Sequence, residues 1–349
     1  FMDDVVFSGY QRDSYLVNAH VPRFGSGEAK GVIDESVRGM DLYILVDVCN
    51  YSLTYSMSGN TNHMSPDDHY QNLKRIIAAV GGKAKRINVI MPFLYESRQH
   101  KRSSRESLDC ALALQELTHM GVDNIITFDA HDPRVQNAIP LSGFETVRPT
   151  YQFVKGLLDR YDDLIIDSDH MMAISPDEGA TERAVYLANV LNLDMGMFYK
   201  RRDYTRVVNG RNPIVAHEFL GSSVEGKDVI ILDDMISSGD SILDVAKQLK
   251  SRNAKRIFAA ATFGLFTNGL DKFDEAYESG LIDGVLTTNL IYQTPELLSR
   301  PYYINCDMSK YVALMIDTLN HDGSISDILD PSERIQVCVE EYKKAHGQL

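Results

Sequence analysis

The sequence predicts an α/β protein with two doubly wound parallel-sheet domains. Short, continuous apolar runs rich in β-branched residues alternate along the chain with longer amphipathic segments. Such an alternation is typical of parallel sheets that are covered by helices on both faces. The length of 349 residues fits about two domains at roughly 100–200 residues each. We place the division near residues 150–160, with domains over 1–155 and 156–349.

In the first domain, apolar runs predict strands and helical periodicity predicts the segments between them. The expected elements are strand 42–46, helix 70–80, strand 87–92, helix 107–120 and strand 124–128. Gly81 and Gly82 are expected to end the first helix, and Gly121 to cap the second, because glycine readily takes the left-handed conformation found after helices. Segment 51–68 is polar and rich in Ser, Asn and Met, so we expect a loop or an insertion there.

The second domain repeats this rhythm of strand and helix. The expected elements are strand 172–175, helix 181–191, strand 195–198, strand 228–232, helix 241–251, strand 256–261 and strand 284–287. The tail after Asp322 is the part of the sequence from which we predict least.

Composition and charge exclude several classes of protein. Hydrophobic residues make up 44% and charged residues 24% of the chain, so neither disorder nor a fibre is expected. Lys and Arg number 35 against 49 Asp and Glu, which gives a net charge of −14. This balance argues against broad nucleic-acid binding, which needs a basic face. It is compatible with a small anionic substrate, because a few cations or a metal ion can reverse the potential inside a cleft.

Cysteine usage and the chain start indicate a cytoplasmic protein. The four cysteines, Cys49, Cys110, Cys306 and Cys338, are scattered and form no CxxC pair, so we expect reduced thiols. No stretch approaches the roughly 20 apolar residues of a membrane span. The first residues lack the basic-then-apolar order of a signal peptide. We therefore expect a soluble protein with no membrane partner.

The most specific polar cluster follows the predicted strand 228–232. Asp233 and Asp234 end this strand, and the hydroxyl-rich turn 237–241 leads into a helix. Ligands of open parallel sheets bind beyond the carboxyl ends of the strands. Carboxylates there can accept hydrogen bonds from sugar hydroxyls, and N–H groups at a helix start can hold a phosphate. The alternative is an N-capped helix with solvated acids.

Two further acidic clusters also follow strands. The first, Asp129-Ala130-His131-Asp132, could face a cleft and bind Mg²⁺ or a nucleotide, although Mg²⁺ prefers oxygen ligands to histidine. Its alternative is a loop histidine bonded to a nearby carboxylate. The second, 174–181, could hold a metal or a ribose through Asp177, and its alternative is simple helix capping.

Two basic clusters could bind a polyphosphate. One is Lys200-Arg201-Arg202, which follows the predicted strand 195–198 and precedes a polar loop. The other spans 97–105, after the strand 87–92. The alternatives are a solvated basic run for the first cluster and a surface loop for the second.

Together, these clusters resemble the ribose-phosphate pyrophosphokinases, which make phosphoribosyl pyrophosphate, and more widely the phosphoribosyltransferases of the type I fold. The resemblance runs from about Pro22 to about Asn289. The matching motifs are, in order, Arg23-Phe24-Gly25-Ser26-Gly27-Glu28, Glu35-Ser36-Val37-Arg38-Gly39, Arg98-Gln99, Asp129-Ala130-His131, Ser175-Pro176-Asp177, Lys200-Arg201-Arg202 and Asp233-Asp234-Met235-Ile236. The first motif and the triple basic run favour a pyrophosphokinase over a plain phosphoribosyltransferase.

The resemblance implies a role for each matching position. Phe24, Ser26, Gly27 and Glu28 would belong to a hairpin that reaches in from a neighbouring subunit and contacts adenine. Arg98, Gln99 and His131 would be further ATP contacts. Positions linked to the Mg²⁺ cofactor would be His131, Asp177 and Asp129. Ribose 5-phosphate would be bound by Arg202, Asp233, Asp234, Ser237, Ser238, Gly239, Asp240 and Ser241. Lys200 and Arg202 would be the catalytic cations of a mobile loop. A homo-oligomer built from dimers, up to a hexamer, is also implied.

The activity implied is that of a ribose-phosphate diphosphokinase, which uses ATP and ribose 5-phosphate in nucleotide biosynthesis. Two departures from the family pattern stand out: Ser26 takes the place of an Asp, and Asp240 lies inside the expected phosphate cradle. An acid in that cradle is unfavourable unless its side chain points away. Two other functions therefore stay open: a non-catalytic regulatory relative that binds nucleotide, and a phosphoribosyltransferase that acts on a base.

Overall fold

The computed structural model describes residues 14–202 and 214–348, and for residues 200–202 and 214–217 it describes the backbone without the side chains. The chain forms two compact units. The first comprises Phe1–Pro149, Asn289–Tyr292 and Asp307–Leu329, and the second comprises Thr150–Thr288, Gln293–Cys306 and Asp330–Leu349. The chain thus enters the second unit close to the division expected at 155/156. The expected domains did not include its two later returns to the first unit.

Long-range hydrogen bonds explain these returns. The Asn289 side chain donates to Asp307 Oδ1 at 2.6 Å and accepts the Met308 N–H at 2.8 Å, so it joins the two returning segments. Asp47, after the first strand of the sheet, accepts the Tyr292 N–H at 2.6 Å. Because these contacts join residues that are far apart in the chain, no pattern in the local sequence predicts them.

The first unit is built on a parallel sheet with the strand order β3-β6-β7-β8 among its described residues. Its elements are β1 (Ala19–His20), β2 (Val32–Ile33), β3 (Asp41–Leu45), β4 (Thr54–Met57), β5 (Asn60–His63), α1 (Pro66–Val80), β6 (Arg86–Ile90), α2 (Asp109–His119), β7 (Asn124–Phe128), the 3₁₀ helix Pro133–Ala138, β8 (Gly143–Val147), α8 (Ser309–Asn320) and α9 (Ser326–Leu329). Three predicted strands are confirmed as β3, β6 and β7. Both predicted helices are confirmed as α1 and α2.

The ends of α1 follow from its sequence. The Ser65 hydroxyl accepts the Asp68 N–H at 3.2 Å, and the Asp68 carboxylate accepts the Ser65 N–H at 3.0 Å. This capping box, with Pro66 in the first turn, starts the helix one turn earlier than predicted. Gly81 ends it with a φ of 60°, as expected.

Segment 51–68 is more ordered than the loop that we expected. Within it, β4 and β5 pair as an antiparallel hairpin, with Tyr55 opposite Asn62, and α1 begins at Pro66. The residues of this hairpin are mostly polar and exposed. No apolar alternation marked its strands, which is why the sequence pattern did not predict them.

The second unit contains a larger sheet with the order β11-β10-β9-β12-β13-β14-β15 among the residues described. Its strands are parallel except for β11, which is antiparallel to β10. The elements are α3 (Thr150–Arg160), β9 (Met171–Ser175), α4 (Thr181–Leu191), β10 (Asp194–Arg202), β11 (Ile214–Leu220), β12 (Asp228–Ile236), α5 (Asp240–Lys250), β13 (Arg256–Gly264), α6 (Asp271–Glu278), β14 (Gly284–Thr288), α7 (Pro295–Leu298), β15 (Tyr303–Cys306) and α10 (Ser332–Ala345). Every strand and helix predicted here is confirmed.

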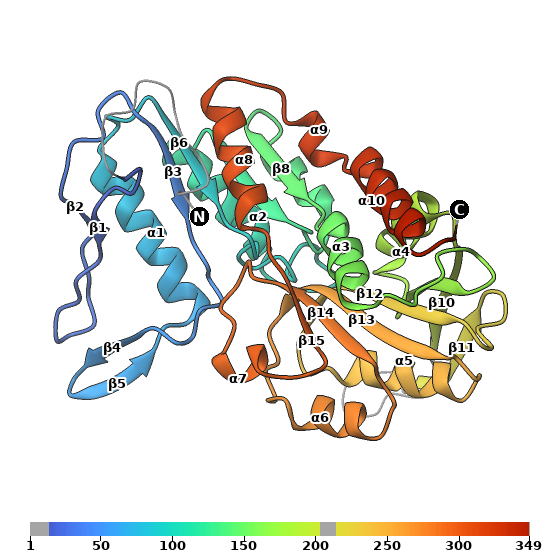
Figure 1. Ribbon diagram of the computed structural model, residues 1–349. Helices are drawn as coiled ribbons and strands as arrows, with labels where there is room; N and C mark the ends of the chain where they lie inside the picture. The colour runs from blue at the N-terminus through green and yellow to red at the C-terminus, as the bar shows by residue number, and fades with distance from the viewer. Residues whose placement is uncertain (1–13, 203–213, 349) are drawn as a thin grey trace. The chain divides into compact units, whose positions relative to one another are not determined.

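Alternate residues of the central strands belong to two separate apolar cores. Met171 and Leu232 pack with α3, α4 and α10, whereas Met172 and Ile231 pack with α5 and α6. Figure 1 shows α5 and α6 on one side of these strands and α3 and α10 on the other. The prediction of a doubly wound domain is therefore confirmed.

The tail contains a helix that our prediction lacked. In α10, Ile335, Val339 and Tyr342 recur at helical spacing and are buried against the first of these cores. This spacing of apolar residues is the sequence pattern that could have predicted the helix. Within the described part of the chain, no helix combines the length and apolar character needed to cross a membrane.

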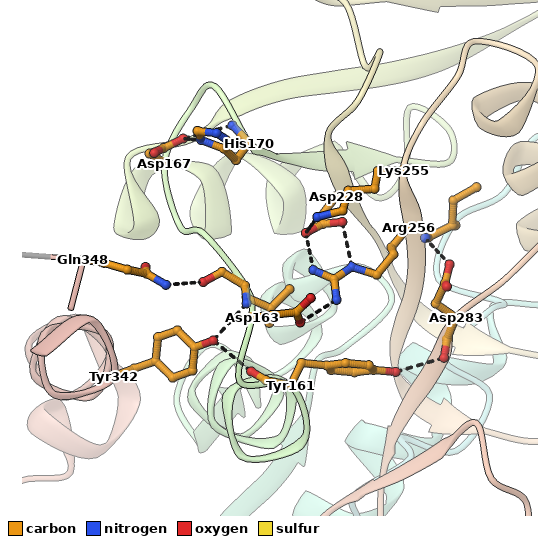
Figure 2. Close-up of polar contacts among 12 residues, drawn as sticks. Tyr161, Asp163, Asp167, His170, Asp228, Lys255, Arg256, Asp283, Tyr342 and Gln348 are labelled. Carbon is orange, nitrogen blue, oxygen red and sulfur yellow. Dashed lines mark hydrogen bonds and ion pairs between the residues drawn. The ribbon is translucent and has the colours of Figure 1, made fainter. Parts of the chain in front are cut away.

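The amino ends of the two sheets carry the same ion pair. In the first unit, Arg86 donates two hydrogen bonds to Asp41 on the neighbouring strand. In the second unit, Arg256 donates two to Asp228, at 2.9 and 2.7 Å (Figure 2). Each Asp is the first residue of its strand, and each Arg is the first residue of the adjacent strand.

The surroundings of these pairs are repeated as well. The sequence Ala-Lys-Arg-Ile occurs at 84–87 and again at 254–257. The Ile87 N–H donates to the Asp123 carboxylate at 2.8 Å, and the Ile257 N–H donates to the Asp283 carboxylate at 2.9 Å. The two units therefore share one local design at the end of the sheet opposite the predicted sites.

Candidate functional site

Three acidic side chains gather at the carboxyl ends of β9 and β12 in the second unit. These strands are parallel neighbours, so the residues that follow them lie at one edge of the sheet. Asp177 accepts the N–H groups of Gly179 and Ala180, at 3.0 and 3.3 Å, in the turn before α4. Asp233 and Asp234 lie in the last part of β12. The structure thus brings these three predicted site residues together.

This acidic cluster is electrostatically crowded. Burial raises the pKa of Asp233 well above its ordinary value, and the nearby charges of Asp234 and Asp177 raise it further. The Asp234 side chain is almost fully buried, and its N–H donates to Asp233 Oδ1 at 2.8 Å. Carboxyl groups in such surroundings are stabilised by a bound cation or by hydroxyl donors. The cluster therefore suits the hydroxyl groups of a sugar, or a Mg²⁺ ion that binds one or two of the carboxylates and keeps several waters.

The turn between β12 and α5 provides free backbone donors. Gly239 has a φ of 82°, and a Cβ at this position would lie 2.4 Å from the Phe273 ring, so a side chain does not fit. Among the residues that the structure describes, the N–H groups of Ser238 and Gly239 have no hydrogen-bond acceptor. Ser241 lies in the first turn of α5, and Ser237 precedes these donors. Free N–H groups at the positive end of a helix dipole are suited to bind a phosphate.

Asp240 is paired with a lysine of α6. Its carboxylate forms an ion pair with Lys272 at 2.5 Å and accepts the Ser238 hydroxyl at 3.0 Å. The hydrogen bond from Lys272 is the main reason that the pKa of Asp240 is lowered. Lys272 thus compensates the negative charge that made Asp240 unexpected next to a phosphate.

The predicted catalytic cations belong to a strand and not to a loop. β10 runs to Arg202, beyond the strand end that we predicted, and pairs with β11, with Lys200 opposite His217 and Arg202 opposite Ile214. Hydrogen bonding to β11 explains why the strand is longer than its apolar run. Residues 203–213, the polar loop that we expected next, lie outside the described residues, as do the side chains of Lys200 and Arg202.

In the first unit, the polar residues that follow β7 lie close to His100, a member of the basic cluster 97–105 to which we gave no role of its own. Asp129 is buried, has a φ of 42°, and donates its N–H to the Val147 carbonyl at 2.8 Å. The rings of His131 and His100 lie 5.3 Å apart. His100 Nε2 lies 3.5 Å from Asp132. Since His100 follows the matched pair Arg98-Gln99 directly, its place in the basic cluster was the signal for it.

Hydrogen bonding and burial shift the pKa values of Asp132 and His100 in this part of the first unit. Hydrogen bonds from Arg134 are the main reason that the pKa of Asp132 falls to about 2. Burial lowers the pKa of His100. Gln99 donates to the Ser107 carbonyl at 2.8 Å, whereas Arg98 is exposed and forms no ion pair with any described residue. Arg98 is therefore a cation that is available to an anionic ligand.

The predicted adenine contacts lie on a turn between β1 and β2. An isolated bridge joins Arg23 to Ala29, and the Phe24 N–H donates to the Glu28 carbonyl at 2.8 Å. The Ser26 hydroxyl donates to the Glu28 carboxylate at 3.0 Å. Phe24 is 55% exposed. The turn therefore presents an aromatic ring beside a carboxylate.

The three predicted metal positions are divided between the units. Asp129 and His131 belong to the first unit and Asp177 to the second. No cluster of three His, Cys, Asp or Glu side chains suited to hold a metal occurs among the described residues. Mg²⁺ usually keeps several waters and binds one or two carboxylates together with substrate phosphates. The oxygen donors around Asp233 fit that mode of binding.

Two family models match the chain. Residues 10–121 match the N-terminal domain of ribose phosphate pyrophosphokinase, and residues 148–287 match the phosphoribosyl transferase domain. The matches together cover both halves of the chain.

Curated relatives match over most of the chain. It is 31% identical over 272 residues to a ribose-phosphate pyrophosphokinase of Mycoplasma genitalium, covering 77% of this chain and 74% of that protein. It is 30% identical over 315 residues to one of Shewanella oneidensis, covering 89% and 90%. The fold resembles that of a phosphoribosylpyrophosphate synthetase from Mycobacterium smegmatis, with a TM-score of 0.73, 24% identity, and coverage of 89% and 93% of the two chains.

Proposed function

The chain belongs to the ribose-phosphate pyrophosphokinase family, and we propose that it transfers the diphosphoryl group of ATP to the 1-hydroxyl of ribose 5-phosphate. The products are phosphoribosyl pyrophosphate and AMP. The observation that carries the proposal is the acidic pair Asp233-Asp234 leading directly into the free N–H groups of the Gly239 turn. A sugar phosphate requires both features: oxygen acceptors for its hydroxyls and backbone donors for its phosphate.

The reaction requires positioning and neutralisation of charge. Attack on the β-phosphorus increases negative charge on the phosphoryl oxygens and on the departing AMP. Lys200 and Arg202 are the proposed catalytic cations, and Arg202 also belongs to the proposed set for ribose 5-phosphate. Held in place, such groups stabilise charge that develops in the transition state.

Bound Mg²⁺ would supply charge screening and a template for both substrates. Following the family resemblance, Asp177, Asp129 and His131 are the positions that we propose to be linked to Mg²⁺. The crowded carboxyl groups near Asp177 support this assignment, because a cation would relieve their mutual repulsion.

On the nucleotide side, we propose contacts from the turn 24–28, Arg98, Gln99 and His131. The turn is proposed to act on a neighbouring subunit, so the working form would be a homo-oligomer built from dimers. We place this reaction of nucleotide biosynthesis in the cytoplasm. The exposure of both Phe24 and Arg98 supports their availability to a ligand.

The decisive experiment measures AMP formed from ATP and Mg²⁺ with and without ribose 5-phosphate. We expect AMP to appear only with the sugar phosphate, in equal amount to phosphoribosyl pyrophosphate. A folded sample that binds ATP but releases no AMP would contradict the proposal and favour a regulatory relative. Release of pyrophosphate from phosphoribosyl pyrophosphate in the presence of a base would instead indicate a phosphoribosyltransferase.

The pairing of Lys272 with Asp240 leads to a prediction about substrate affinity. Lys272→Ala should raise the KM for ribose 5-phosphate by about two- to fivefold, because the unpaired Asp240 carboxylate then repels the phosphate. Turnover should change little. The measurement is steady-state kinetics at low ionic strength.

Two further variants control this experiment. Lys247→Ala removes an exposed lysine from α5 that pairs with Asp244, and its KM should match that of the wild type. Asp240→Gly combined with Lys272→Ala should restore the KM. An unchanged KM in the single variant Lys272→Ala would mean that the charge of Asp240 has no effect on the binding of ribose 5-phosphate.

A further inference from the structure

The turn 23–29 rests on the β4–β5 hairpin, which is part of segment 51–68. The Arg23 guanidinium lies 3.8 Å from the centre of the Tyr55 ring and donates to Asp68 at 3.0 Å. It also donates to the Gly27 carbonyl at 3.0 Å. The Arg23 side chain is only 11% exposed, so its charge is held between the ring and the carboxylate. Contacts that exclude water in this way are stronger than the same contacts on an open surface.

A second set of contacts joins the hairpin to the tip of the turn. The Ser58 N–H donates to the Gly25 carbonyl at 2.9 Å. Gly27 has a φ of 93°, and a Cβ there would lie 2.6 Å from Met57 Sδ, so the Met57 side chain packs directly against the backbone of Gly27. The turn is thus fixed by the hairpin at its root and at its tip.

The same turn leaves the Phe24 ring half-exposed. Its backbone is closed by the bond from the Phe24 N–H to the Glu28 carbonyl and by the bond from the Gly27 N–H to the Phe24 carbonyl, at 2.9 Å. A glycine-containing turn without outside support would sample many conformations, and binding would have to order it. An ordered turn presents its ring to a flat ligand without that cost.

We propose that the β4–β5 hairpin is a positioning element for nucleotide binding, and that Tyr55 and Met57 hold the turn so that Phe24 meets the purine base. This inference rests on the proposed function for the identity of the ligand. Tyr55 contacts Arg23 at the root of the turn, so we assign it a positioning role. Replacing Tyr55 should therefore weaken the binding of the nucleotide. It should leave the binding of ribose 5-phosphate unchanged, because the proposed site for that substrate lies on β12 and α5.

The test compares Tyr55→Leu with Tyr55→Phe. Leucine removes the aromatic face beneath Arg23, whereas phenylalanine keeps it. Thr61→Ala is a matched control, because Thr61 is exposed on β5 of the same hairpin. Calorimetry with α,β-methylene ATP should show about tenfold weaker binding for Tyr55→Leu and wild-type binding for the other two variants. The affinity for ribose 5-phosphate should be the same in all four proteins.

Hydrogen exchange provides a readout that is independent of the nucleotide. Amides of residues 22–30 should exchange several-fold faster in Tyr55→Leu, while those of α1 should keep their protection. Unchanged exchange in this segment would overturn the proposal. Faster exchange with unchanged analogue affinity would also overturn it, because the hairpin would then be structural only. AMP release by the wild type is measured on the same samples, so failure of the proposed reaction is recorded separately.

Discussion

Lys200→Ala is expected to lower turnover by about 10²–10³-fold while the KM for ATP changes little. The reason is that the cation acts on charge that develops in the transition state and not on the ground-state nucleotide. The position of Lys200 supports this role. β10 runs parallel to β9 with Met197 opposite Ser175, so residue 200 lies beyond the carboxyl end of β9, the edge at which Asp177 follows.

Steady-state kinetics with ribose 5-phosphate and ATP varied in turn provides the measurement. Lys250→Ala is a matched control, because it removes the same charge from the last turn of α5. Lys200→Arg keeps the charge and should recover part of the turnover. If Lys200→Ala turned over at the wild-type rate, Lys200 would have no part in the chemical step. A raised KM for ATP with unchanged turnover would assign it to uniform binding instead.

Elements that are buried on both faces were the easiest to predict. All residues of β9 and β14 are buried, so their apolar runs are continuous and their bounds were predicted to within one residue. The β4–β5 hairpin is the opposite case. Its strands expose most of their polar residues, so no apolar alternation marks them, and its contacts with the turn 23–29 join residues that are distant in sequence.

The candidate site shows the same division between local and distant information. Asp177 and Asp233 could be placed together because parallel strands end at a common edge of a sheet. The lysine that compensates Asp240 could not be found in this way. Lys272 lies on α6, 32 positions further along the chain, and nothing in the local sequence identifies it as the partner. The sequence pattern thus located the acidic residues at the edge of the sheet, and the structure revealed the lysine that pairs with one of them.

The second prediction concerns stability and follows from the ion pair at the amino end of the larger sheet. Asp228→Asn is expected to reduce the free energy of unfolding by about 3–5 kcal/mol. The Asp228 side chain is 3% exposed and accepts two hydrogen bonds from Arg256 (Figure 2). Without the carboxylate, the guanidinium would stay largely buried, with only the exposed Asp163 as a charged partner.

Urea unfolding followed by circular dichroism measures this effect, with Asp163→Asn as the matched control. Asp163 binds the same arginine at 2.7 Å but is 69% exposed, so its loss should cost less than about 1 kcal/mol. Equal losses in the two variants would mean that burial of the charge is not the cause. Replacing both members of the pair, Asp228→Leu with Arg256→Met, leaves no buried charge unpaired. That double variant should therefore be more stable than Asp228→Asn alone, although it has lost both hydrogen bonds.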